Sequence, residues 1–346
     1  MELDRRAVLK ASGVAALMGS TGLAGCSGGL LGGGSGGSGP ESWQYDPSTL
    51  GDAANVAFGS MDYATIYENR QYFPESTRSG LEQTDSASPV SPEDIDFITG
   101  VGGGSVSMMD SSGSGTGAVA IAGSFEKDAI TSQVESQEGS SQVGEYEGYT
   151  LYESTTMGQQ LGPNASGSAV AGVGSDAVVV GFAFASGGSS GSSGREAVET
   201  AIDASNGNAD RLRGNNDYAT TVSDGIGDAT ARFGGVGDPQ LIDQYAGMAG
   251  AQTQTYVNGL RAGGFGMSLE GETTTFDVVI AYESSQAAQD TGLASLVQGI
   301  APQIEQEEGI NSVTASQDGS TVTITVEGDT ATLLQQANST APTGSV

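Results

Sequence analysis

The sequence predicts an α+β protein: two similar modules, each an antiparallel sheet with helices packed on one face, after a disordered lipid-anchored tether. The first observation behind this prediction is that the order strand, helix, hairpin, helix occurs twice along the chain. The second is that each hairpin has apolar runs on both sides of a short polar turn. The third is the abundance of glycine, 56 of 346 residues, which confines the core to short apolar segments.

Apolar periodicity marks the strand and the first helix of each module. In the first module the run 117–122 predicts a strand, and apolar residues at helical spacing predict a helix over 124–134 that is capped by its first residue. In the second module the strand covers 274–282 and the helix 287–297. Pro302 is expected beyond the end of the second helix, because proline is disfavoured in a helix interior.

A hairpin follows the helix in each module. The first hairpin covers 169–180, around a Gly-Ser-Asp turn. The second has strands 311–316 and 321–326 around a turn that contains Asp318-Gly319, a dipeptide typical of tight hairpin turns. Residues of the last strand alternate strictly between threonine and Val or Ile, so its apolar side chains are expected on one face.

A capped helix closes each module. Ser193 and Glu196 form the pattern of a capping box before the apolar residues of 197–202. Asp329 is the expected N-cap of a helix with apolar residues in 331–334.

The boundary between the modules is expected near 205–225, where asparagine and glycine interrupt the periodicity. The organisation that follows is a signal peptide (1–25), an anchor and tether (26–46), a first module (47–207), a second module (208–338) and a disordered tail (339–346).

The N-terminus indicates export. Arg5-Arg6 precede a large apolar residue, leucine and lysine, which matches the twin-arginine pattern. The apolar stretch 11–24 is shorter than the roughly 20 residues that span a bilayer, and it therefore predicts a signal-peptide core. It ends in Leu23-Ala24-Gly25-Cys26, the pattern of a lipobox, and the chain has no second cysteine. Cys26 is therefore the expected lipid-bearing thiol.

These motifs resemble those of haloarchaeal lipoproteins exported through the twin-arginine pathway. The resemblance covers the first 26 residues and implies a route and an anchor, with the mature chain on the extracellular side of the cell membrane. The Gly/Ser run 27–40 after the anchor predicts a flexible tether with an end-to-end distance of roughly 20 Å.

Charge and composition exclude several classes of function. The chain has 42 acidic residues, 11 basic residues, two of them lysine, and a net charge of −31. This charge argues against nucleic acid as a partner. Dispersed acids with little lysine are typical of proteins that work in molar salt, where screening acts over about 3 Å. The absence of histidine excludes serine and cysteine triads and HExxH zinc sites, and one cysteine excludes an internal disulfide.

Candidate chemistry in the rest of the chain is weak. The glycine runs Gly102–Gly104 and Gly113–Gly117 lack the lysine of a phosphate-binding loop and are interpreted as low-complexity loops. Carboxylate pairs such as Asp94 and Asp96 are interpreted as solvated surface. No catalytic, cofactor-binding or metal-ligating residue is therefore assigned.

Two further features are singled out. The aromatic segment 43–72 is either the first strand and helix of the core or, because it adjoins the tether, a binding surface. Asn164 and Asn338 match the N-glycosylation acceptor pattern.

The sequence favours a non-enzymatic, membrane-anchored extracytoplasmic lipoprotein with a structural or binding role at the cell surface. The membrane is its expected partner through the lipid on Cys26, and surface-layer or transporter proteins are candidate protein partners. One alternative is the substrate-binding lipoprotein of a transporter, and a hydrolase that works with two carboxylates is the least favoured.

Overall fold

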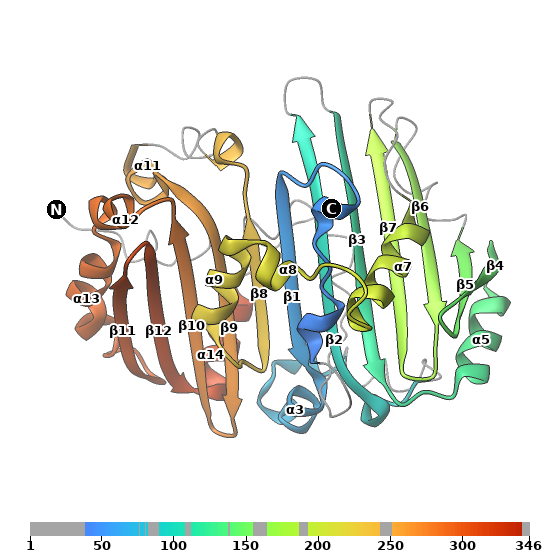
Figure 1. Ribbon diagram of the computed structural model, residues 1–346. Coiled ribbons are helices and arrows are strands. Elements are labelled where there is room, and N and C mark those ends of the chain that lie inside the picture. Colours follow the sequence, from blue (N-terminus) through green and yellow to red (C-terminus); the bar gives the residue numbers. More distant parts are fainter. Residues whose placement is uncertain are drawn as a thin grey trace.

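The computed structural model describes residues 39–75, 77–79, 81, 90–107, 112–137, 139–154, 165–186, 193–242 and 251–340. Their strands form one antiparallel sheet in the order β11-β12-β10-β9-β8-β1-β2-β3-β7-β6-β5-β4 (Figure 1). The strands are β1 (Asn55–Asp62), β2 (Ile95–Ser107), β3 (Ser112–Gly123), β4 (Ser140–Tyr146), β5 (Tyr149–Ser154), β6 (Ala165–Val173), β7 (Ala177–Ser186), β8 (Ala231–Val236), β9 (Leu260–Glu270), β10 (Thr273–Tyr282), β11 (Ile310–Asp318) and β12 (Thr321–Asp329).

Helices lie on both faces of the sheet. We call face A the face that carries α7, α8 and α9 and is turned to the viewer in Figure 1, and face B the opposite face. The helices of face A are η1 (Pro40–Trp43), η2 (Pro47–Thr49), α7 (Gly194–Ser205), α8 (Leu212–Asn215) and α9 (Asp217–Ile226). Those packed on face B are α3 (Tyr63–Glu68), α5 (Lys127–Ser136), α13 (Leu293–Ile304) and α14 (Thr330–Thr340). The remaining described helices are η3 (Arg70–Tyr72), η4 (Pro92–Asp94), α11 (Ala251–Val257) and α12 (Ser285–Thr291).

The strand register shows how the two faces differ in polarity. Residues directly opposite each other on neighbouring strands point to the same face. One row of face A runs through Gly172, Val179, Ala120, Thr99, Ser60, Arg232, Gly266, Asp277, Thr325 and Thr314. It is apolar under α7, mixed at the centre and polar at the β12 and β11 end.

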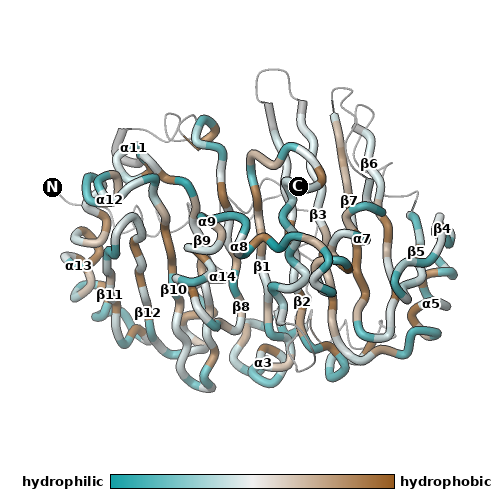
Figure 2. Tube along the Cα trace, viewed as in Figure 1, coloured by the Kyte–Doolittle hydropathy of each residue, from teal (hydrophilic) through white to brown (hydrophobic). Residues whose placement is uncertain are grey.

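The neighbouring row on face B is apolar over the same strands. It consists of Ala171, Val180, Val119, Gly100, Gly59, Phe233, Phe265, Val278, Ile324 and Ala315. Figure 2 shows brown apolar stretches along the strands and teal residues at many of the turns. Face B therefore has the more uniform apolar pattern.

The predicted mixture of antiparallel strands and helices is confirmed, but the strands of both predicted modules belong to one sheet. The two halves meet where β1 pairs with β8, with Phe58 opposite Gly234 and Gly59 opposite Phe233. Each glycine leaves room for the ring across from it, since a Cβ on Gly234 would lie 2.4 Å from the Phe58 ring. The prediction of helices on one face of each module is wrong, because α5 packs on face B and α7 on face A.

Several local predictions are confirmed. Both hairpins form, as β6 with β7 and as β11 with β12, and Gly319 has φ 56° in the second turn. Ser193 and Glu196 make the predicted capping box of α7. The Asp329 carboxylate accepts the backbone N–H of Thr332 at 2.8 Å, as expected of an N-cap.

Other local predictions need correction. The helix predicted over 287–297 is two helices, because Gly292 adopts a left-handed φ of 61° between α12 and α13. Pro302 lies inside α13 rather than beyond its end. Helix α5 begins at Lys127 after Glu126, so Ser124 is not its cap.

The glycine runs predicted as loops are strand residues. Gly102–Gly104 lies in β2, and Gly113–Gly117 lies in β3. A Cβ on Gly104 would lie 2.4 Å from the carbonyl oxygen of Ser114, and one on Gly117 would lie 2.6 Å from the Phe182 ring. Close packing therefore requires glycine here, which composition alone cannot separate from a flexible loop.

Candidate functional site: the segment that attaches the tether

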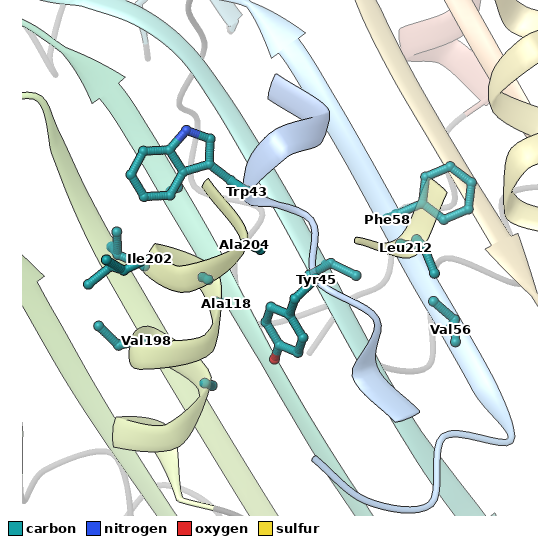
Figure 3. Packing of buried hydrophobic residues seen from close by; sticks show 14 of the residues in the cluster. Trp43, Tyr45, Val56, Phe58, Ala118, Val198, Ile202, Ala204 and Leu212 are labelled. Atoms are coloured by element: carbon teal, nitrogen blue, oxygen red, sulfur yellow. The ribbon is translucent and has the colours of Figure 1, made fainter. Parts of the chain in front are cut away.

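The candidate functional site is the segment that follows the predicted tether, which we call the attachment segment (residues 39–50). It contains η1 and η2 and crosses the middle of face A beside α7 and α8 (Figure 3). Pro40 and Pro47 each stand at the start of a 3-10 helix, where proline loses no hydrogen bond. The Asp46 side chain accepts the backbone N–H of Ser48 at 3.0 Å and caps η2.

Two aromatic side chains of this segment are built into the core. Trp43 is 7% exposed and Tyr45 is 0% exposed. Figure 3 places them near Ile202 and Ala204 of α7 and near Leu212. The interpretation of this part of the aromatic segment as core is confirmed, and these two rings do not form an exposed binding surface. Burial of rings of this size contributes several kcal/mol to stability.

The backbone of the attachment segment is fixed to the chain that precedes α8. The N–H of Leu212 donates to the carbonyl of Gln44 at 2.8 Å, and the N–H of Asp46 donates to the carbonyl of Asp210 at 2.9 Å. Tyr45 forms an isolated antiparallel bridge with Arg211 between these two bonds. The segment is therefore bound like a short strand, through both its backbone and its side chains.

A buried amide joins the segment to the central strands. The Gln44 side chain is 4% exposed, and its Nε2 donates to the carbonyl of Gly59 and to the Thr99 hydroxyl, both at 2.9 Å. The Thr99 hydroxyl in turn donates to the carbonyl of Gly59 at 3.1 Å. Because a buried polar group is costly without partners, this network selects one position for the segment on the sheet.

Glu41 forms the electrostatic part of the attachment. Its carboxylate makes an ion pair with the Arg232 guanidinium at 2.8 Å and a second with Arg213. Arg232 lies on β8, is only 11% exposed and donates from Nε to the Ser60 hydroxyl at 2.8 Å. Arg213 also pairs with Asp224 at the solvent-exposed end. Glu41 thus connects the incoming chain to both halves of the sheet.

Two titratable groups of the attachment have shifted pKa values. Hydrogen bonding to Glu41 raises the pKa of Arg213 above its usual value, with Asp224 acting in the same direction. Burial raises the pKa of Tyr45, because a phenolate in this core would be desolvated, and the Thr116 hydroxyl offsets part of that effect. Both groups therefore keep their protons over the whole physiological range.

Most cations among the described residues contact other groups of the chain. Four arginines form ion pairs with carboxylates, namely Arg195 with Glu199, Arg213 with Glu41 and Asp224, Arg232 with Glu41, and Arg261 with Glu283. Lys127, Arg70 and Arg211 donate to backbone carbonyls. Among the described residues no Asp or Glu falls in the buried class, although one carboxylate oxygen of Glu41, Oε1, is inaccessible to solvent.

Most of the predicted site residues fall where the structure gives no description. Arg5, Arg6, Cys26 and Asn164 lie outside the described residues. Asn338 lies in α14, which continues to Thr340, so residues 339 and 340 are helical where a disordered tail was predicted. Glu41, Arg213 and Arg232 were missed, because they are isolated charges far apart in the sequence and have no local signal.

No group of three or more Cys, Asp or Glu side chains in the described part of the chain is arranged to hold a metal ion. No helix among these residues is both long and apolar enough to cross a membrane.

Comparison with known proteins finds a distant likeness of shape. No family model matches the chain, and no curated protein sequence matches it. The chain is similar to crystal form III of TP0453, with a TM-score of 0.46 and 12% identity over 87% of this chain and 98% of that one. Crystal form IV of TP0453 gives a TM-score of 0.41 and 13% identity over 87% and 99%. At this level the likeness carries no argument about function.

Proposed function

We propose that the chain is a membrane-anchored extracytoplasmic lipoprotein with a non-enzymatic structural or binding role at the cell surface. The observation that carries the proposal is the position of Cys26. The chain's one cysteine ends a lipobox pattern, and residues 27–38 of the Gly/Ser run separate it from a segment that is fixed in the core. A lipid-anchored protein is expected to have this order of lipid-bearing cysteine, tether and packed segment, because a force on the anchor acts on the first packed residues after the tether.

The attachment segment supports this role by its construction. A chain that only trailed from the body would need no buried aromatic rings and no ion pairs to a strand and a helix of the body. Trp43 and Tyr45 provide the packing, and Glu41 joins the segment to β8 through Arg232. We infer that these contacts transmit load between the lipid and the whole sheet.

We further infer that the body arose by internal duplication. Counted outward from the centre, the first half has the order β1-β2-β3-β7-β6 and the second half β8-β9-β10-β12-β11. In both halves a helix on face B follows the third strand and precedes the hairpin. The closing helices differ, since α7 packs on face A and α14 on face B. The proposal therefore includes a later divergence in how the halves are covered.

The alternative of a transporter's substrate-binding lipoprotein gains no support from this architecture. Such a protein needs two lobes that can close around a ligand. Here both halves share one sheet, joined by six residue pairs between β1 and β8. A rigid joint of this kind favours a scaffold.

The acidic composition supports a working environment of high salt. No described Asp or Glu falls in the buried class, and only four arginines form ion pairs with carboxylates, so most acids lack a cationic partner and repel one another when unscreened. We therefore expect the melting temperature to fall when molar KCl is replaced by ~50 mM KCl, because the Debye length grows from about 3 Å to more than 10 Å. An unchanged melting temperature would remove this part of the proposal.

Fractionation of cells that export through the twin-arginine pathway tests the lipoprotein proposal. The full-length chain is expected in the membrane fraction, and Cys26→Ser in the soluble exported fraction. A Ser27→Ala variant is the matched control and should stay with the membrane. Replacement of Arg5 and Arg6 by lysine should leave the precursor inside the cell. Recovery of Cys26→Ser in the membrane fraction would contradict the anchor.

A further inference from the structure

We infer that face A is the surface that this protein turns towards the lipid headgroups of its own membrane, held there by the short tether. The inference rests on the proposed lipid anchor and adds an orientation to it. Its basis is the place where the tether joins the body. Pro40 starts η1, and η1 lies on face A against α7 and β2 (Figure 1).

The joint is near the middle of a broad face. Twelve strands at a spacing of about 4.8 Å make a sheet roughly 55 Å wide. The attachment segment lies beside β1 and β2, six or seven strands from either edge of the sheet order. A tether fixed at an edge would let the body stand upright on the membrane, whereas a tether fixed at the centre of a face brings that face down.

The length of the tether decides between the two faces. Fourteen residues of Gly/Ser composition have an end-to-end distance of roughly 20 Å, and their fully extended length is about 48 Å. With face A down, only the helix layer of face A, about 10 Å thick, separates Pro40 from the headgroups. With face B down, the sheet and a second helix layer also stand between them. That orientation stretches the tether beyond its ordinary length and costs entropy.

An edge-on orientation is disfavoured for the same reason. It places the attachment segment about half the sheet width, or roughly 27 Å, above the membrane. All three orientations are within reach of an extended tether, so the preference is one of population and should be several-fold. It should also depend on tether length in a predictable direction.

The chemistry of face A suits a hydrated headgroup layer. Beyond α9, the outer strands present a flat polar area that we call the hydroxyl plateau. Its hydroxyl residues are Thr275, Ser312, Thr314, Ser316, Thr321, Thr323 and Thr325, and the carboxylates of Asp277, Asp318 and Glu327 stand among them on the same face. Hydroxyl groups donate and accept hydrogen bonds with water and with headgroup oxygens, and the carboxylates keep this area hydrated and outside the hydrocarbon. Face A can therefore lie against the membrane surface without entering it.

The test uses the thiol chemistry of the chain. Because the one native cysteine carries the lipid, a single added cysteine is the only free thiol of the lipidated protein. Asn206→Cys at the end of α7 places a fluorophore on exposed face A, and Gln303→Cys on α13 places it on exposed face B. Each labelled protein is reconstituted in molar KCl into phosphatidylcholine vesicles that contain a lipid with a nitroxide on its headgroup.

Quenching at residue 206 is expected to be several-fold stronger than at residue 303. Equal quenching, or stronger quenching at 303, would overturn the orientation while leaving the anchor intact. Failure of both proteins to remain with the vesicles would instead count against the lipoprotein proposal.

A variant with a longer tether tests whether the length of the tether causes the orientation. Duplication of residues 27–38 raises the end-to-end distance of the tether to about 30 Å. The ratio of quenching between the two positions should then fall towards one. A ratio that stays the same with the long tether would overturn the claim that the tether orients the body.

Discussion

The strands β7 and β6 in the first region and β12 and β11 in the second occupy corresponding places in the two halves of the sheet, but they have different covers on face A. Over β7 and β6 lies α7, whose Val198 and Ile202 are fully buried against residues such as Val179. In Figure 1 the described helices of face A end at α9, and β12 and β11 are bare towards the viewer. The positions there are Thr323 and Thr325, in the same rows as the covered residues of β7.

The difference shows that the strand pattern, and not the strand order, decides where a helix packs. On face B both regions are apolar, with Val178 and Val180 in β7 and with Ile324 and Val326 in β12. On face A only the first region offers small and apolar residues, and so only there can a helix bury its own apolar side. The closing helix of the second half, α14, accordingly packs on face B through Leu334.

The largest loss in the free energy of unfolding is expected when a buried side chain of α7, the helix that covers β7 and β6, is truncated. Ile202→Ala leaves a cavity under a side chain that is 0% exposed, and we expect it to lower the free energy of unfolding by about 2–5 kcal/mol. Denaturant unfolding in molar KCl measures this. Thr200→Ala on the partly exposed side of the same helix is the matched control and should cost less than about 1 kcal/mol. Equal losses would contradict the assigned role of α7.

A change in the strand below α7 should have the next largest effect. A Cβ on Gly181 would lie 2.2 Å from the carbonyl oxygen of Gly194, so Gly181→Ala forces the helix away from β7. We expect a loss of about 1–3 kcal/mol in the free energy of unfolding. Gly299→Ala, in the open interior of α13, should be neutral or stabilising because a Cβ there meets nothing within 4 Å. If Gly299→Ala lowered the free energy of unfolding as much as Gly181→Ala, the close packing of α7 on β7 would not explain the effect at Gly181.

The joint between the halves should be sensitive to the charge of Glu41. Glu41→Gln leaves Arg232 without its carboxylate, and we expect a loss of about 1–2 kcal/mol, reduced from the value for a fully buried pair because Glu41 is 22% exposed. Asp224→Asn removes a partner of the exposed Arg213 and should cost no more than about 0.5 kcal/mol. Thermal unfolding of the two variants in the same salt compares them, and equal shifts would contradict a central role for Glu41.

Part of this account could be predicted from the sequence, namely the features that depend on near neighbours. The Asp318-Gly319 turn, the Ser193–Glu196 capping box and the Asp329 cap are local and form as predicted. The single sheet depends on the pairing of β1 with β8, whose paired residues are 170 to 180 positions apart and carry no local signal. The same limit applies to Glu41, which pairs with an arginine 172 residues away.

Alkaline pH should destabilise the first half of the sheet, through tyrosines of β4 and β5, before it destabilises the second half. Burial, followed by the hydrogen bond to Asp203, raises the pKa of Tyr146 to about 12. Burial and the Asp176 carboxylate raise the pKa of Tyr149 further. The folded chain therefore keeps phenolic protons that the unfolded chain loses near pH 10. Their contribution to stability is complete below pH 10 and is lost as the pH rises through about 12.

Tyr282 of β10, in the second half of the sheet, provides the comparison. Burial raises its pKa to about 12, but its hydroxyl donates to the carbonyl of Tyr256 and not to a carboxylate. Tyr149→Phe should move the midpoint of alkaline unfolding more than Tyr282→Phe does. Circular dichroism and phenolate absorbance, followed from pH 9 to about 13, measure both midpoints. A larger shift for Tyr282→Phe would contradict the role of the carboxylates.

The smallest effect is expected on the hydroxyl plateau. Thr323→Val keeps the shape and the strand preference of the residue and removes one hydroxyl from a face that no described helix covers. The free energy of unfolding should change by less than about 0.5 kcal/mol. A loss comparable with that of Gly181→Ala would show that face A is covered in the second region as well.

The intact mass of the protein purified from the membrane fraction is the sharpest test of the lipid anchor. We expect a chain of 321 residues that begins at Cys26 and carries the added mass of a lipid. The mass of the full 346-residue chain, or of a chain from Cys26 without added mass, would contradict the anchor. Without the anchor, the proposed transmission of force through the attachment segment and the proposed orientation of face A towards the membrane would both be unsupported.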